Sequence, residues 1–305
     1  MTVKGLMRPG MVQVRVLDME EALVHYKERI GLYEVCREGD KVFLKGYDEF
    51  DHHSIVLRET DNAGMDFMAF KVDTDENLTH YTKRLNDYGV ETDEIAAGDQ
   101  PGVGRRIGFM LPTGHRIELY AESEMSDPHP ELENPRIWPV VPHGMGATRF
   151  DHALLYGPGI AVATKLLEDC LDFYTAEYVE APDGTIATWV TVSNKAHDLA
   201  FVEHPDPGKL HHVAFHLQDW AEVGKAADLI TFHEISRDVG PTRHGITRGQ
   251  TIYFFDPSGN RNEVFAGGYT YYPDNPTRKW LVDNLGRGIF YYEGELNEAF
   301  LSVVT

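Results

Sequence analysis

The feature that most constrains the fold is an internal repeat, because three blocks of the first half recur in the same order in the second half. The segment from Gly10 (GMVQVRVLDMEEALVHYKERIGLYE) corresponds to the segment from Asp151 (DHALLYGPGIAVATKLLEDCLDFYT). The other two pairs, each displaced by 145 residues, are Met65–Val72 with Leu210–Leu217 and Met110–Ala121 with Phe255–Ala266. Such a repeat indicates one structural unit used more than once, so the 305-residue chain is expected to form two similar halves.

Each half has the pattern of a strand, a helix and several further strands. Asp18 followed by Glu21 is typical of a helix N-terminus, and the same pattern begins at Asp219. A further helix near Asp75–Tyr88 is expected to end at Gly89. The runs that alternate as half-buried strands do are Val42–Tyr47, His115–Tyr120 and Thr188–Val192. The chain is therefore predicted to be an α+β protein rich in strands.

A proline-rich segment separates the two halves. Five prolines lie within Ser126–Pro142, which disfavours regular structure. We therefore expect an N-terminal domain over residues 1–125, a linker over 126–147 and a C-terminal domain over 148–305. Beyond Gly268 an aromatic tail is expected to return over the core, and its residues Trp280, Phe290, Tyr291 and Tyr292 could belong to the core or to an interface.

Composition and charge limit the partners and the location. The chain is 42% hydrophobic and 25% charged, as is usual for globular proteins. Its 49 acidic and 28 basic residues give a net charge of −21, which disfavours nucleic acid as a partner. The sequence has no apolar stretch of about 18 residues, so no membrane span is predicted. Cys36 and Cys170 are expected to be reduced thiols. A cytoplasmic protein without a membrane partner is predicted.

Aligning the repeats predicts where a metal could bind. The positions that carry ligand-type side chains in the second half are His152, His212 and Glu263. The same positions in the first half are Met11, Phe67 and Glu118. Two imidazoles and one carboxylate are the ligand set of non-haem iron(II) oxygenases, which leaves other metal positions free for substrate and oxygen. Only the second half is therefore expected to hold a metal with its own residues.

The spacing leaves two alternatives open at this candidate site. His211 competes with His212, because neighbouring residues cannot be separated by spacing alone. Glu263 could instead be a paired surface carboxylate, as expected for Glu118.

The segment Thr242–Glu263, TRHGITRGQTIYFFDPSGNRNE, resembles the signature of the extradiol ring-cleavage dioxygenases. The resemblance extends over nearly the whole chain, including RFDHALLYG, KAHDLAF and LHHVAFHL. It implies the vicinal oxygen chelate fold, in which four βαβββ units pair into two barrel-like open sheets with the helices outside. It also implies that only the second domain holds iron, in agreement with the repeat.

The resemblance implies roles for six residues. The iron ligands would be His152, His212 and Glu263, and the choice of His212 over His211 rests on the resemblance alone. Three further residues would act on the substrate: His197 as the base that takes a catechol proton and later returns it, and His244 and Tyr253 as hydrogen-bond partners of its oxygens. The implied cofactor is Fe(II), with Mn(II) as an alternative, and the implied assembly is a homotetramer.

The implied reaction is the opening of a catechol ring by O2, beside the two hydroxyl groups, to a 2-hydroxymuconic semialdehyde. Within the same fold, a glyoxalase-like isomerase or epimerase is the alternative enzyme, although such sites draw ligands from two modules. A non-enzymatic ligand-binding module is the alternative outside enzymes. The substituents tolerated on the ring cannot be predicted from the sequence.

Overall fold

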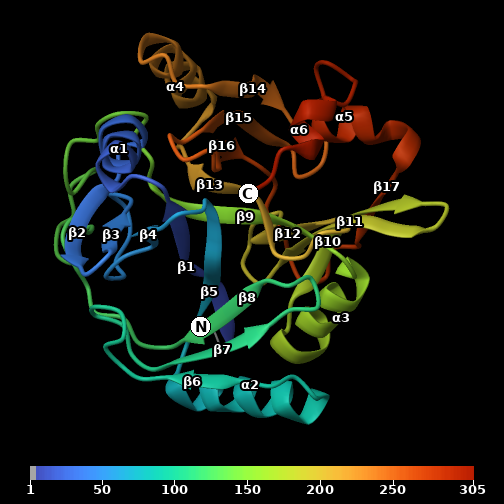
Figure 1. Cartoon of the computed structure of the whole chain (residues 1–305), viewed down its shortest axis with the longest axis horizontal. Helices are drawn as coiled ribbons and strands as arrows, with labels where there is room; N and C mark the ends of the chain where they lie inside the picture. Colours follow the sequence, from blue (N-terminus) through green and yellow to red (C-terminus); the bar gives the residue numbers. More distant parts are fainter. Residues whose placement is uncertain (1–4) are drawn as a thin grey trace.

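The computed structural model describes residues 5–305 and contains two sheets, one from each half of the chain (Figure 1). The first four residues of the expected N-terminal domain thus lie outside the described part. The elements of the first half are β1 (Leu6–Val16), α1 (Met19–Leu23), the π-helix Val24–Ile30, β2 (Tyr33–Glu38), β3 (Lys41–Lys45), β4 (Ile55–Glu59), β5 (Gly64–Val72), α2 (Asp75–Tyr88), β6 (Asp93–Ile95), β7 (Arg106–Met110) and β8 (Arg116–Tyr120).

The second half repeats this order and adds a tail. Its repeated elements are β9 (Arg149–Gly157), α3 (Ile160–Leu171), β10 (Tyr174–Ala181), β11 (Gly184–Thr191), β12 (Leu199–Glu203), β13 (Lys209–His216), α4 (Trp220–Phe232), β14 (Arg237–Arg243), β15 (Gly249–Phe255) and β16 (Arg261–Gly267). The tail contains β17 (Arg278–Leu281), the 3-10 turn Val282–Asn284, α5 (Leu285–Ile289) and α6 (Glu298–Ser302). Four βαβββ units, as predicted, make up the chain.

The two sheets have the same strand topology. The first has the order β2-β3-β4-β1-β5-β8-β7-β6, and the second has the order β14-β15-β16-β13-β9-β12-β11-β10-β17. In each sheet two units meet through an antiparallel pair, β1 with β5 and β9 with β13. The helices α2, α3 and α4 lie on the outside (Figure 1). The extra strand β17 pairs in parallel with β10 and lengthens one edge of the second sheet.

The register of the strands confirms the repeat residue by residue. Ala69 of β5 faces Met11 of β1 and Glu118 of β8, just as Ala214 of β13 faces His152 of β9 and Glu263 of β16. Positions aligned in the sequence are therefore equivalent in space. The two histidines and one glutamate of the second sheet therefore occupy the same places as the methionine, phenylalanine and glutamate of the first sheet.

The predicted helix ends are confirmed. The Asp18 carboxylate accepts a hydrogen bond from the Glu21 backbone N–H, and Asp219 caps α4 in the same way. Helix α2 ends at Gly89, whose φ of 95° is one that glycine adopts without strain.

The expected first helix differs from the structure, because it widens into a π-helix after Leu23. The wider turn accompanies the burial of two consecutive residues, His25 and Tyr26, against the second half. The Tyr26 hydroxyl donates to Asp256, and His25 Nε2 lies 2.8 Å from the side-chain oxygen of Asn262.

The structures of the linker and of the aromatic tail can be compared with what their composition predicted. Residues 126–148 contain no helix or strand. Of the four tail aromatics considered, Phe290 is buried, Trp280 is half-buried, and Tyr291 and Tyr292 are exposed. Across residues 5–305, no helix is long and apolar enough to cross a membrane.

Candidate metal centre

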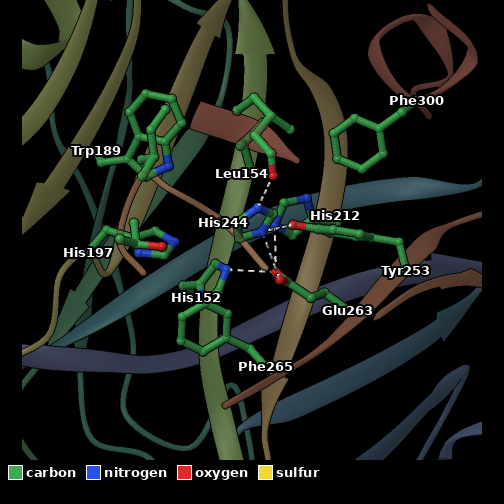
Figure 2. Close-up of a pocket in the computed structure, with 13 residues that line it drawn as sticks. His152, Leu154, Trp189, His197, His212, His244, Tyr253, Glu263, Phe265 and Phe300 are labelled. Carbon is green, nitrogen blue, oxygen red and sulfur yellow. Dashed lines mark hydrogen bonds and ion pairs between the residues drawn. The ribbon is translucent and has the colours of Figure 1, made fainter. Parts of the chain in front are cut away.

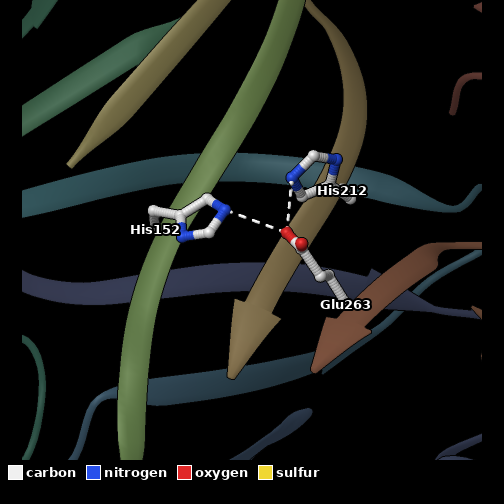
Figure 3. A group of neighbouring side chains, drawn as sticks. All are labelled: His152, His212 and Glu263. Atoms are coloured by element: carbon white, nitrogen blue, oxygen red, sulfur yellow. Dashed lines mark hydrogen bonds and ion pairs between the residues drawn. The ribbon is translucent and has the colours of Figure 1, made fainter. Parts of the chain in front are cut away.

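Three buried side chains converge from adjacent strands of the second sheet (Figure 3). His152 comes from β9, His212 from β13 and Glu263 from β16. The Nε2 atoms of the two imidazoles lie 2.9 and 3.1 Å from the same Glu263 oxygen, Oε2. Within the described residues, these form the one group of three ligand-type side chains whose ligand atoms lie within 4.8 Å of one another. His211 is not a member of this group.

Hydrogen bonds behind the rings orient both imidazoles. Nδ1 of His152 lies 2.8 Å from an Asp151 carboxylate oxygen, to which it donates. Asp151 is itself paired with Lys195. Nδ1 of His212 lies 2.7 Å from Nδ1 of His211. In both cases Nε2 is the atom left facing the centre, and this arrangement is common for metal-binding histidines.

The electrostatics of the cluster favour a bound cation. Burial by itself raises the pKa of Glu263, but the charge and hydrogen bonds of His152 and His212 outweigh it and hold that pKa well below the usual value. Burial lowers the pKa of His212 to about 4. Burial by itself lowers the pKa of His152, but the Glu263 and Asp151 carboxylates outweigh it and raise that pKa. The protonated His152 ring is therefore the positive partner that the buried Glu263 carboxylate needs, and a metal ion would take that place. The donor set therefore fits a divalent metal ion.

The three other predicted residues lie around the same pocket (Figure 2). His197 lies just before β12, and its ring centroid is 4.0 Å from that of His152. His244 Nδ1 donates to the backbone oxygen of Ile289, and His244 Nε2 lies 2.9 Å from the Tyr253 hydroxyl. All three side chains line this one pocket. Its apolar walls are Leu154, Trp189, Ile246, Phe265, Ile289 and Phe300.

Burial sets the protonation of two of these groups. It lowers the pKa of His197 well below the usual value, and the neighbouring His152 and Lys195 charges lower it further, so His197 is a neutral imidazole. Burial and the Glu263 charge raise the pKa of Tyr253 well above the usual value, so Tyr253 keeps its hydroxyl proton. A neutral imidazole can accept a proton, and a phenol can donate a hydrogen bond.

Sequence reasoning missed Thr247, another polar group in the pocket wall. The Thr247 hydroxyl is buried and has no hydrogen-bond partner among the described residues. Thr247 and Arg248 have φ angles of 60° and 61°, an unusual conformation for residues other than glycine. The Thr247 N–H donates to the buried carboxylate of Glu177. Thr247 and Glu177 are 70 residues apart in the sequence, and no local pattern marks either residue as part of the pocket.

The equivalent place in the first half is filled by apolar side chains and an arginine. Met11 and Phe67 pack together with Tyr120 in a small buried cluster. Glu118 is buried and accepts a hydrogen bond of 2.8 Å from Nε of Arg106. The strand register places Arg106 where the second half has Thr251. The guanidinium groups of Arg106 and Arg116 thus balance Glu118.

Comparison with known proteins places this geometry in a family. Residues 65–124 match the catechol 2,3-dioxygenase-like N-terminal domain, and residues 149–264 match the glyoxalase/bleomycin resistance protein/dioxygenase superfamily. A metapyrocatechase of Pseudomonas sp. (strain CF600) is 50% identical over 99% of both chains. The chain belongs to the extradiol ring-cleavage dioxygenases. A second member, the manganese-dependent 2,3-dihydroxybiphenyl 1,2-dioxygenase of Geobacillus genomosp. 3, is 30% identical over 94% of both chains.

Solved extradiol dioxygenase structures share the fold. The 2,3-dioxygenase LapB from Pseudomonas sp. KL28 superposes with a TM-score of 0.90 at 44% identity, covering 93% of this chain and all of the other. The homoprotocatechuate 2,3-dioxygenase of Arthrobacter globiformis shares the fold at 24% identity with a TM-score of 0.87, covering 99% of this chain and 93% of the other. The vicinal oxygen chelate fold and the dioxygenase activity predicted above are thereby confirmed, and the two alternative functions are set aside.

Proposed function

We propose that this extradiol dioxygenase uses Fe(II) and O2 to open the ring of catechol and simple substituted catechols, giving 2-hydroxymuconic semialdehydes. The observation that carries the proposal is the buried His152–His212–Glu263 cluster at a pocket that also presents His197, His244 and Tyr253. The relatives support the substrate class, since one of them is a metapyrocatechase.

The donor set supports iron as the metal. Two histidines and one carboxylate that leave open positions are typical of non-haem Fe(II) oxygenases. When bound, Fe(II) would hold the diol and dioxygen side by side and pass electrons between them. Mn(II) is the alternative, because one relative is described as manganese-dependent. Activity restored to metal-free protein by each ion separately distinguishes the two.

Three side chains would act on the substrate itself. His197, neutral and next to His152, would take a proton from a catechol hydroxyl and later return it. Tyr253 keeps its proton and would donate a hydrogen bond to a substrate oxygen. His244 is held by the Ile289 carbonyl so that its Nε2 faces the Tyr253 hydroxyl. His244 would contact the same substrate oxygens as Tyr253, and its hydrogen bond to the Ile289 carbonyl would keep its ring in position for that contact.

The residues that line the pocket favour a small substrate ring without a charged substituent. In the described part of the chain, no lysine or arginine lines the pocket. A catechol with a carboxylate substituent would lose hydration there without gaining a cationic partner, and this is costly. We therefore propose that unsubstituted and small apolar catechols are preferred over acidic ones.

The direct test is the yellow colour of a hydroxymuconic semialdehyde. Iron(II)-loaded protein is mixed with catechol without air, and air is then admitted. We expect yellow only when iron and oxygen are both present, and no yellow with Glu263→Ala, which removes the carboxylate from the cluster. A colourless wild-type mixture with iron demonstrably bound would overturn the catechol proposal. An active Glu263→Ala variant would overturn the metal assignment.

The assembly and the location are also proposals. We propose a homotetramer in the cytoplasm, built from the two domains and the linker expected from the sequence. Exposed apolar side chains gather in the linker region, at Leu132, Ile137, Trp138 and Val141, and such groups often mark interfaces between proteins. Cys36 and Cys170 are free thiols, which fits a reducing compartment. Light scattering in solution would test the tetramer, and fractionation of the source cells would test the location.

A further inference from the structure

A second buried histidine stands directly behind the candidate ligand His212. His211 and His212 are consecutive in β13, and consecutive side chains of a regular strand point to opposite faces. The pairing of β13 with β9 shifts between Leu210 and His212, which marks a β-bulge. Bulges re-aim side chains. Both rings are consequently buried, and their Nδ1 atoms lie 2.7 Å apart.

The other nitrogen of His211 contacts the tail. His211 Nε2 lies 2.9 Å from the backbone oxygen of Phe300 in α6. A carbonyl oxygen can only accept, so Nε2 of His211 carries the proton and its Nδ1 is an acceptor in the neutral ring. His212 can then donate from its own Nδ1. This leaves the lone pair of His212 Nε2 directed at Glu263, where the metal would sit.

We propose that His211 is a positioning residue that holds His212 in the tautomer able to bind the metal. The proposal rests on the metal centre proposed above and adds a hydrogen-bonded chain that runs from the Phe300 carbonyl through His211 to His212. Partners of this kind fix ring orientation and tautomer, and their loss lowers metal affinity.

The first half provides an internal comparison. The residues equivalent to His211 and His212 are Asp66 and Phe67. Asp66 accepts hydrogen bonds from Arg58 and Arg15 and makes no contact of this type with its neighbour. At these aligned positions the histidine pair therefore occurs only in the half that carries the other candidate ligands; the first half has a histidine pair elsewhere, at His52 and His53.

The acceptor at Phe300 is held in place by contacts on both sides. Arg261 Nη1 donates to the backbone oxygens of His211 and Val303, so one guanidinium joins β13 to the tail. The backbones of Leu210 and Thr305 exchange two hydrogen bonds of 2.9 and 3.0 Å. In Figure 1 the end of the chain accordingly lies in the middle of the molecule, beside β9 and β13. The tail is thus part of the support of the metal site.

Three substitutions at one position separate hydrogen bonding from packing. In His211→Asn the side-chain oxygen lies near the place of Nδ1 and can still accept from His212. In His211→Gln the amide can still donate to Phe300, but no acceptor remains for His212. His211→Leu removes both bonds. The full chain, stripped of metal, is titrated with Fe(II) alone by anaerobic calorimetry, and the thermal midpoint of each metal-free variant reports on folding.

The expected result is a loss of Fe(II) affinity of about 10- to 100-fold for His211→Gln and His211→Leu, and recovery of most of that affinity in His211→Asn. Equal affinity in all the variants and the wild type would overturn the proposal. An equal loss in all three variants would also overturn it, because packing alone would explain the result. Wild-type protein that binds Fe(II) no better than Glu263→Ala would instead refute the metal centre itself.

Discussion

The orientation of single side chains in this protein can depend on hydrogen-bond partners that lie far away in the sequence. The contact between His152 and Asp151 joins adjacent residues and is accessible to sequence reasoning. The partner of His211, by contrast, is the carbonyl of Phe300, 89 residues further along the chain. A backbone oxygen leaves no mark on the residue type that carries it. The sequence pattern therefore indicated the candidate ligands, with the family resemblance choosing His212, but it could not show that the Phe300 carbonyl supports His211.

At the residue scale, replacing His197 tests its role as a base. We expect His197→Asn to lower kcat by about a hundredfold or more, because a positioned acid or base contributes at least that much. The iron content should stay at the wild-type level, since His197 is outside the candidate ligand set. Steady-state oxygen uptake and iron analysis provide the measurements.

The matched control for this experiment is His80→Asn, which changes an exposed histidine in α2. If His197→Asn retained the kcat of this control with iron bound, His197 would not be the base.

At the scale of elements, the order of strands and helices could be predicted because it follows local patterns. The capping residues Asp18 and Asp219 and the alternating strands act within a few residues, and each was found as predicted. The π-helix at Val24–Ile30, the bulge at His211 and the edge strand β17 depend on contacts between distant elements. No local pattern encodes them, so they were missed.

Glu177 shows how one buried carboxylate joins several elements. Situated in β10, it accepts hydrogen bonds from the Thr247 N–H, the Tyr269 hydroxyl and the Trp280 indole N–H. These contacts connect β10 with three other parts of the chain: the strained pocket loop at Thr247, the segment that follows β16, and strand β17. The unusual backbone at Thr247 costs free energy, and the carboxylate helps to maintain it.

We therefore expect Glu177→Gln to lower the free energy of unfolding by about 2 kcal/mol, since a neutral amide cannot satisfy all three donors. The KM for catechol should rise as the pocket loop relaxes. The matched control is Glu180→Gln in the same strand, where the side chain makes an exposed ion pair with Lys279. Identical thermal midpoints and KM values for the two variants would contradict this role of Glu177.

At the scale of the whole molecule, the two halves are joined by buried polar contacts. His115, at the start of β8, donates from Nε2 to the Lys209 backbone oxygen at the start of β13. Its Nδ1 lies 2.9 Å from the Thr113 hydroxyl. Burial lowers the pKa of His115 to about 4. Burial therefore requires a neutral ring in the folded protein, although the hydrogen bond to Lys209 by itself favours the charged form.

This requirement predicts a loss of stability in acid. The unfolded chain binds the His115 proton near pH 6.5 and the folded chain only near pH 4, so stability falls as the pH is lowered through this window. The loss from this one residue amounts to about 3 kcal/mol at pH 4. Thermal midpoints of the metal-free protein, measured between pH 7.5 and 4, should fall less steeply in His115→Gln than in the wild type. Parallel curves would rule out this contribution.

The buried arginine beside Glu118 in the first half, Arg106, bears on how the duplicated halves can evolve. Forming a second metal centre there would require histidines at Met11 and Phe67 and removal of Arg106. Either histidine alone would meet a guanidinium instead of a metal, and losing Arg106 alone would leave the buried Glu118 with Arg116 as its remaining ion-pair partner. Each of these changes made alone therefore loses a packing contact or an ion pair and does not complete a metal site. A metal site in the first half would therefore need several substitutions together, which is why single mutations are expected to keep the two halves different.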